Sequence, residues 1–198
     1  SIDGSAFYQY KALKTITFDD SSASALETIG PGAFGDCEAL TEISIPNNVT
    51  SIGERAFQRC KALATIIIGD SSKLKTIGEF AFEGCEALTT ISIPNVTSIG
   101  ERAFHECNAL ETITFGNLSA FNTIGRRAFY KCEALTTISI PNSVEIIGPD
   151  AFNGCRTLAT ITFRDSSILE TIGDSAFIDC VALITISIPN SVEIIGND

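Results

Sequence analysis

The sequence predicts one repeat-solenoid domain over residues 1–198, built from eight stacked coils with a parallel β-sheet. Three observations predict this fold. Eight copies of the dipeptide Ala-Phe recur at intervals of 22 to 27 residues. A Leu-x-x-Ile-x-Ile segment, or a close variant, follows each copy at a fixed distance, and an Ile-Gly pair precedes each of the later copies. Periods of this length are typical of solenoids.

Each coil is expected to contribute one short strand. In residues 40–45, buried isoleucines alternate with Glu42 and Ser44, the period of two that a half-buried strand requires. β-branched Thr and Ile are the commonest residues of the equivalent segments, and such residues are enriched in β-strands. The outward positions should form two columns on one exposed face, and these are the candidate binding residues: Thr15, Thr17, Glu42, Ser44, Thr65, Ile67, Thr90, Ser92, Thr112, Thr114, Thr137, Ser139, Thr160, Thr162, Thr185 and Ser187.

The segment Ala-Phe-x-x-Cys-x-x-Leu should return the chain on the opposite, convex side of each coil. Its apolar residues lie about one turn apart, which favours a short helical or 3₁₀ segment. The Gly after Ile marks a corner where a side chain would crowd the turn. Once the coils stack, the Ile, Ala, Phe, Cys and Leu columns form a continuous core that no single coil could bury alone.

A second period of two coils overlies the first. Even coils turn tightly after the strand with Pro-Asn, whereas odd coils carry a longer polar turn. The unit of duplication is therefore a coil pair, present four times. One rim should alternate short loops with protruding ones at residues 19–25, 69–73, 116–120 and 164–168.

These motifs resemble the leucine-rich repeats, most closely the BspA-like class. The resemblance rests on Leu-x-x-Ile-x-Ile-Pro-Asn, as at 88–95, and on Gly-x-x-Ala-Phe-x-x-Cys-x-x-Leu, as at 100–110, and it covers essentially the whole chain. It implies a right-handed solenoid with the parallel sheet on its concave face. It also implies a surface-exposed or secreted protein that binds other proteins. It does not imply a particular partner, because one fold hosts many functions.

The seven cysteines occupy one column in coils two to eight, and Tyr10 takes that place in the first coil. They lie more than twenty residues apart, unlike the close pairs of zinc sites. Stacked neighbours about 4.8 Å apart are also wider than the roughly 3.8 Å between the Cβ atoms of a disulfide. A ladder of small buried thiols is the favoured interpretation, with disulfides and a metal site as the alternatives.

The sequence offers no catalytic set, so we expect no enzyme, cofactor or metal. His105 is the single histidine, and no motif places an Asn or Asp to orient it beside Cys107. No phosphate-binding glycine loop and no recurring carboxylate pair is present. The net charge of −11 without a Lys/Arg cluster argues against nucleic acid and anionic membranes as partners. No apolar run is long enough to span a membrane.

Two further expectations concern glycans and the ends of the solenoid. Sequons begin at Asn48, Asn95 and Asn117, in or just after the turns that follow strands, where a glycan could be accommodated. Pro-Asn turns also use Asn for backbone reasons. Neither terminal coil has the polar outer face of a capping repeat, so we expect a fragment whose ends are covered by further coils, a companion domain or another subunit.

Three functions stay open at this stage. The leading one is a non-catalytic protein-interaction module that uses the concave sheet and the protruding odd-coil loops. A structural spacer or adhesin stalk is the alternative, because near-identical coil pairs lack the side-chain diversity of a specific binding surface. Ice binding through Thr-x-Thr ladders is more remote, since Glu42, Ile67, the Ser positions and the expected curvature all weaken it.

Overall fold

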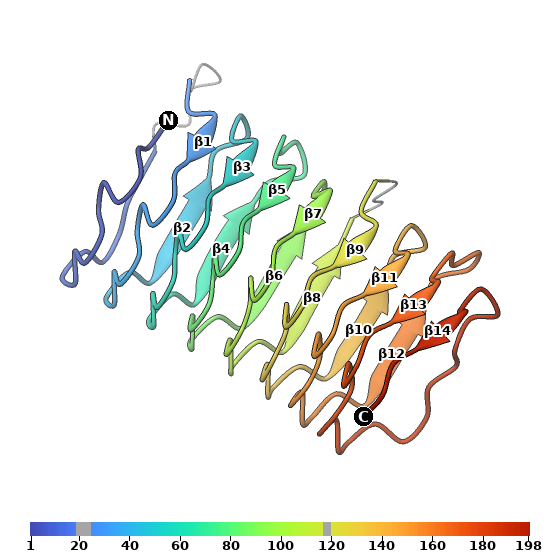
Figure 1. Cartoon of the computed structure of the whole chain (residues 1–198). Coiled ribbons are helices and arrows are strands. Elements are labelled where there is room, and N and C mark those ends of the chain that lie inside the picture. Colours follow the sequence, from blue (N-terminus) through green and yellow to red (C-terminus); the bar gives the residue numbers. More distant parts are fainter. Residues whose placement is uncertain (19–24, 117–119) are drawn as a thin grey trace.

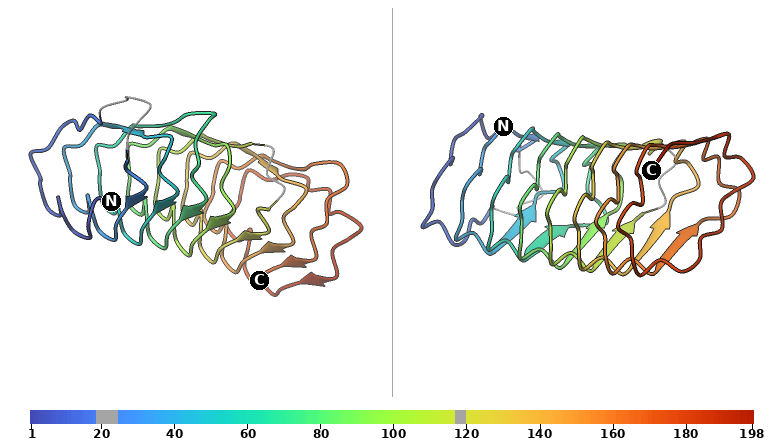
Figure 2. Two further views of the ribbon diagram at one scale, coloured as in Figure 1. Left: turned by 90° about the horizontal axis from the view of Figure 1, so that it is seen from above. Right: turned by 60° about the horizontal axis from the view of Figure 1, so that its bottom comes forward.

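The computed structural model describes residues 1–18, 25–116 and 120–198, and over these residues the chain winds as a parallel β-solenoid of about seven turns. The eight Ala-Phe motifs of the sequence mark the successive coils. Figure 2 shows these coils stacked one behind another along the solenoid axis, and Figure 1 places the two termini at opposite ends of the stack.

Within the described residues the strands form two sheets in which every pairing is parallel. The six-stranded sheet contains the predicted strands of coils two to seven: β2 (Glu42–Ile45), β4 (Thr65–Ile68), β6 (Thr90–Ile93), β8 (Thr112–Phe115), β10 (Thr137–Ile140) and β12 (Thr160–Phe163). The eight-stranded sheet consists of two-residue strands: β1 (Thr28–Ile29), β3 (Ser51–Ile52), β5 (Thr76–Ile77), β7 (Ser98–Ile99), β9 (Thr123–Ile124), β11 (Ile146–Ile147), β13 (Thr171–Ile172) and β14 (Ile194–Ile195).

The second sheet was not anticipated, because the Ile-Gly pairs were interpreted only as corners. The structure explains the glycines by close approach between coils. A Cβ atom on Gly78 would lie 2.7 Å from the backbone nitrogen of Glu54 and 2.7 Å from the carbonyl carbon of Gly53. Each glycine therefore lets one coil stack directly against the glycine of the coil before it.

The prediction of helical or 3₁₀ segments on the convex side is wrong: over the described residues this side consists of successive β-turns. The Cys37 N–H bonds the Phe34 carbonyl three residues back, at 3.2 Å, but the Phe34 N–H bonds Ala56 of the next coil, at 2.7 Å. Backbone N–H groups thus alternate between their own coil and the neighbouring coil. The residues two before and two after each Phe have positive φ, as at Arg55 (54°) and Arg59 (56°), and a helix cannot include such residues.

The predicted core columns are confirmed. The phenylalanine rings stack in one file from Phe7 to Phe177, with centroids 5.2 to 5.5 Å apart and interplanar angles of 14° or less. Such offset parallel stacking adds to the area that each ring buries. Leucine and isoleucine columns run alongside, and those of coils two to seven are almost fully buried.

The cysteine column is a ladder of buried free thiols, as expected. The structure adds a feature that the sequence did not reveal. Each Sγ–H donates to the carbonyl oxygen of the Phe in the preceding coil, at 3.1 to 3.3 Å. The thiols therefore fill the core between Phe and Leu and also bond successive coils to one another.

Candidate binding surface

The outward columns of the six-stranded sheet form continuous rows, as predicted. The first row begins at Thr15, whose isolated bridge pairs it with Glu42, and strand pairing carries it from there to Thr160. The second row, from Ser44 to Thr162, follows the same register. Thr185 and Ser187 are exposed, but they lie in a segment of the last coil that forms no strand, so the structure does not join them to these rows.

Both rows are hydroxyl-bearing and uncharged over most of their length. Thr occupies five consecutive positions in the first row, from Thr65 to Thr160. Two residues interrupt the pattern, and both lie near the N-terminal edge of the sheet. They are the carboxylate of Glu42 on β2 and the side chain of Ile67 on β4, which is 47% exposed.

The odd-coil loops line the rim beside this sheet. The loop at 69–73 is described in full, whereas residues 19–24 and 117–119 of two other predicted loops lie outside the described residues. Ser72 is buried, and its hydroxyl oxygen accepts a hydrogen bond from the Leu74 N–H at 3.1 Å. The Asn95 side-chain amide of the following even coil donates to the Ser72 carbonyl at 2.9 Å. The short Pro-Asn turn of this even coil thus supports the long loop of the odd coil beside it.

The loop at 164–168 is held by a bond that spans two coils. Where a residue with an N–H follows a strand, that group can bond the last carbonyl of the preceding strand, as Gly116 bonds Ile93 and Arg164 bonds Ile140. Pro141 has no N–H, so the Phe115 carbonyl loses its ladder donor. The Arg164 guanidinium supplies the replacement, at 3.0 Å to the Phe115 oxygen and 3.3 Å to the Gly116 oxygen.

Glycosylation at the predicted sequons stays a prediction. The Asn48 side-chain oxygen accepts a hydrogen bond from the Lys73 ammonium at 2.9 Å. At Asn95 the side-chain nitrogen, to which a glycan would be attached, already donates to the Ser72 carbonyl. Asn117 lies outside the described residues.

The convex side carries paired charges. In the column after Cys, lysine and glutamate alternate over the first four coils, and Lys11–Glu38 (2.9 Å) and Lys61–Glu86 (3.3 Å) form ion pairs. They border an open polar hollow of about 520 Å³ beside Gly84. Exposed pairs of this kind contribute little to stability. The arrangement agrees with a solvated face.

His105 lies within this convex surface. Its ring stacks on Tyr130 with a centroid distance of 4.9 Å, and its Nδ1 is 3.4 Å from a carboxylate oxygen of Glu83. Burial lowers the pKa of His105, while Glu106 and Glu83 oppose that shift. Across the described ranges, no group of three or more His, Cys, Asp or Glu side chains is arranged to hold a metal ion.

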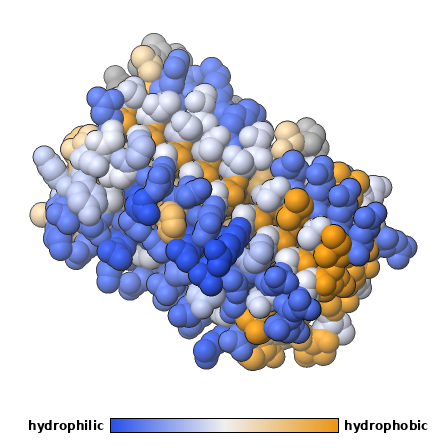
Figure 3. Space-filling model, viewed as in Figure 1, coloured by the Kyte–Doolittle hydropathy of each residue, from blue (hydrophilic) through white to orange (hydrophobic). Residues whose placement is uncertain are grey.

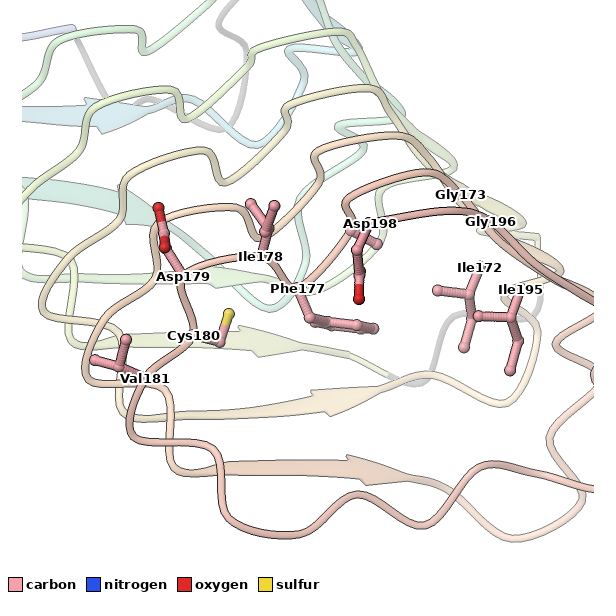
Figure 4. A pocket seen from close by; sticks show the side chains of 11 residues that line it. Ile172, Gly173, Phe177, Ile178, Asp179, Cys180, Val181, Ile195, Gly196 and Asp198 are labelled. Carbon is pink, nitrogen blue, oxygen red and sulfur yellow. The ribbon is translucent and has the colours of Figure 1, made fainter.

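A second hollow, of about 440 Å³, opens at the C-terminal end of the solenoid (Figure 4). It is lined by core-column residues of the last coils, including Ile172, Phe177 and Cys180, and Figure 4 shows Phe177 and Asp198 facing its centre. In earlier coils the following coil covers the corresponding side chains. The hollow is therefore uncovered core surface, and the neighbouring Val181 and Ile184 are 78% and 91% exposed.

Sequence reasoning missed a third exposed surface, the outward column of the eight-stranded sheet. The only sequence signal for this column is the residue that precedes each Ile-Gly pair. Because each strand has only two residues, no alternation of polar and apolar residues marks it. The column reads Thr28, Ser51, Thr76, Ser98, Thr123, Ile146, Thr171 and Ile194.

This geometry, stacked coils with a parallel sheet and a polar outer face, defines a repeat solenoid of the leucine-rich-repeat class. The model of the BspA type leucine-rich repeat region matches residues 1–123 and 122–198 in six copies. The chain belongs to this family. In the part of the chain that the structure describes, no helix is long and apolar enough to cross a membrane.

Solved structures with the same fold are bacterial leucine-rich-repeat proteins. A protein from Eubacterium ventriosum is 32% identical with a TM-score of 0.71, over 83% of this chain and 44% of its own. The pneumococcal vaccine antigen PcpA is 25% identical with a TM-score of 0.63, over 96% and 49%. A T. pallidum leucine-rich-repeat protein, 24% identical with a TM-score of 0.52 over 82% and 74%, shares the fold. The chain thus spans less than half the length of the first two. No curated protein matches it.

Proposed function

We propose that this chain is a non-catalytic protein-interaction module whose partner contacts the outward face of the six-stranded sheet and the odd-coil loops beside it. The observation that carries the proposal is the pair of continuous exposed rows, interrupted at Glu42 and Ile67. Leucine-rich-repeat domains generally mediate protein interactions, and the family supports that general role. We expect this face to be the concave side.

The interruptions at Glu42 and Ile67 are the expected centre of contact. A uniform hydroxyl row offers a partner the same chemistry at every coil. Burying an exposed aliphatic side chain against a partner removes apolar surface from water and so favours binding. A carboxylate favours partners that place a positive charge opposite it. The register pairs Ser44 with Ile67 and Glu42 with Thr65, so the two groups are diagonal neighbours within reach of one partner segment.

The test is a selection of binders from a displayed peptide library against the immobilised chain, followed by variants. Thr90→Arg and Thr137→Arg each place a long cation on the sheet face, whereas Asn108→Arg makes the same charge change on the convex side. We expect the first two to weaken the selected binders by about tenfold or more, a loss of 1.4 kcal/mol or above. Binders that lose affinity only with Asn108→Arg would contradict the proposal.

A structural spacer or adhesin stalk is the second candidate. It is favoured by the five consecutive Thr positions of the first row, because this row offers a partner the same side chain in each of coils three to seven. A spacer predicts that deleting one internal coil pair shortens the molecule and leaves binding unchanged. Ice binding is the remote third candidate, and the mixture of Ser, Thr and Ile in the second row counts against it.

We also propose a cell-surface or secreted location. The support is the likeness to the pneumococcal vaccine antigen PcpA. Protease treatment of intact source cells, with immunodetection of this chain, tests the location directly.

A further inference from the structure

The outward column of the eight-stranded sheet becomes partly apolar in its last three coils. The first five strands of this sheet (β1, β3, β5, β7 and β9) carry only Thr or Ser at this position. In the last three strands, Ile146 in β11 and Ile194 in β14 flank Thr171 in β13. Ile146 and Ile194 are 40% and 57% exposed, and Ile168, in the loop before β13, is 48% exposed. Figure 3 shows the larger apolar areas at the C-terminal end of the solenoid, where β13 and β14 and the uncovered side chains of the last coil lie, with hydrophilic surface beside them.

A row of carboxylates runs alongside these isoleucines. Glu145, Glu170 and Glu193 each come directly before one of the three strands. Their backbones are hydrogen-bonded in succession, since the Glu193 N–H donates to the Glu170 carbonyl and the Glu170 N–H donates to the Glu145 carbonyl, both at 2.8 Å. The corresponding residues of the two preceding coils, Thr97 and Asn122, are neutral, and in the earlier coils the position holds Glu27, Thr50 and Lys75, so only these last three coils carry carboxylates in succession.

Among the residues that the structure describes, no cation forms an ion pair with this acidic row. The ion pairs found among residues 1–18, 25–116 and 120–198 involve other carboxylates. Like charges on adjacent strands destabilise a sheet. Three such residues in three successive coils, which also expose Ile146, Ile168 and Ile194, suit a partner that brings both cations and apolar side chains.

The distance between successive coils indicates which secondary structure of the partner fits the row. Neighbouring strands are about 4.8 Å apart, so three successive coils span roughly 9.6 Å. Successive turns of an α-helix rise about 5.4 Å, and cations on three turns span roughly 10.8 Å. Same-face residues of a strand along the axis lie about 6.7 Å apart, so three span roughly 13.4 Å. A helix therefore matches the row within about 1.2 Å, whereas a strand misses it by almost 4 Å.

We propose that Glu145, Glu170 and Glu193, together with Ile146, Ile168 and Ile194, form a docking surface for a basic amphipathic α-helix of another protein. The helix lies along the solenoid axis, with Lys or Arg on successive turns over the glutamates and aliphatic residues over the isoleucines. A second copy of this chain is disfavoured as the occupant, because two chains that each carry a net charge of −11 repel one another. The surface belongs to the other sheet, so it does not depend on the proposed function.

The probe is a fluorescent, stapled helical peptide with Lys at three positions on successive turns and Leu on the adjacent positions. A peptide of the same composition with the Lys and Leu positions scrambled around the helix is its control. We expect the amphipathic peptide to bind the intact chain at least about tenfold more tightly by fluorescence anisotropy. Equal binding of the two peptides would reduce the interaction to net charge and overturn the proposal.

Two triple variants locate the site. Glu145→Gln, Glu170→Gln and Glu193→Gln remove the row, while the matched control Glu27→Gln, Glu79→Gln and Glu133→Gln removes equal charge elsewhere. The first should lose about tenfold or more in affinity and the second less than about twofold. Equal losses would overturn the proposal. So would a concentration-dependent dimer that only the first triple abolishes, because the occupant would then be a second copy.

A separate variant tests the apolar half of the surface. Ile146→Thr restores the residue type of the earlier coils and keeps the charge. We expect it to weaken the amphipathic peptide by about threefold to tenfold while the circular dichroism spectrum and the urea midpoint stay near those of the parent chain. Unchanged binding would show that the isoleucines take no part, and would overturn the amphipathic assignment.

Discussion

Alkaline pH should unfold this protein because its core contains a column of protonated thiols. Burial raises the pKa of Cys60, Cys85, Cys107, Cys132 and Cys155 well above the ordinary value for a cysteine. In the unfolded chain these thiols ionise near pH 8.5. Below that pH both states are protonated and the folded state keeps its full stability. Above it the unfolded chain loses protons that the folded chain retains, so stability falls as the pH rises.

The size of the effect follows from the number of thiols. Each contributes a slope of about 1.4 kcal/mol per pH unit above its unfolded pKa. At about pH 10 the five deeply buried thiols together remove roughly 10 kcal/mol, which is comparable with the whole stability of a typical domain. Burial raises the pKa of Cys180 to about 11, so its own contribution levels off near that pH.

The assay is urea unfolding by circular dichroism over a pH series from about 7 to 10.5, with thiolate absorbance followed in the same samples. Cys132→Ala removes one ionising group and should reduce the slope above pH 8.5 by about 1.4 kcal/mol per unit. Thiolate absorbance should rise together with unfolding. A urea midpoint that stays constant to pH 10.5, or thiolates that form in the folded protein, would refute the reasoning.

Substitutions at three positions test other parts of the fold by urea unfolding at neutral pH. Phe104→Ala leaves a gap in the middle of the ring stack and should cost about 3–5 kcal/mol, and a loss below about 1 kcal/mol would show that the coils close over it. At Arg59, where φ is 56°, the Gly variant should be about 1 kcal/mol more stable than the Ala variant, and the reverse order would contradict the assigned backbone conformation. Arg164→Ala should cost about 1–3 kcal/mol by leaving the carbonyl beside Pro141 without a donor, while the exposed control Arg156→Ala changes stability by less than about 0.5 kcal/mol.

The stacking of coils in this fold could be predicted because the same motif recurs in every coil of the sequence. The strand of residues 42–45 was recognised from its alternation, and the rows on its face followed from the coil period. The second sheet was not predictable in the same way, because a two-residue strand such as Thr76–Ile77 has no periodicity of its own. Only the stacking of coils, which supplies the partners of its hydrogen bonds, turns such a segment into a strand.

The error on the convex side has a similar origin. Phe34, Cys37 and Leu40 are three residues apart, and a bond from residue i+3 back to residue i links each pair. A helical turn and a series of β-turns both produce that spacing. They differ in the destination of the intervening N–H groups, and the N–H of Asp36 bonds Gln58 in the next coil. Local sequence carries no information about that partner.

Departures from the repeat are therefore the best guide to function in this chain. A core position such as Phe104 repeats because the stack leaves one shape for it, so its recurrence reports on folding. An outward position such as Ile146 is free to be Thr, and a change there has to be explained by something outside the coil. Like charges on successive coils repel, so the row from Glu145 to Glu193 disfavours the isolated chain. A bound cationic helix reverses the sign of that contribution, which makes the row unfavourable for folding and favourable for recognition.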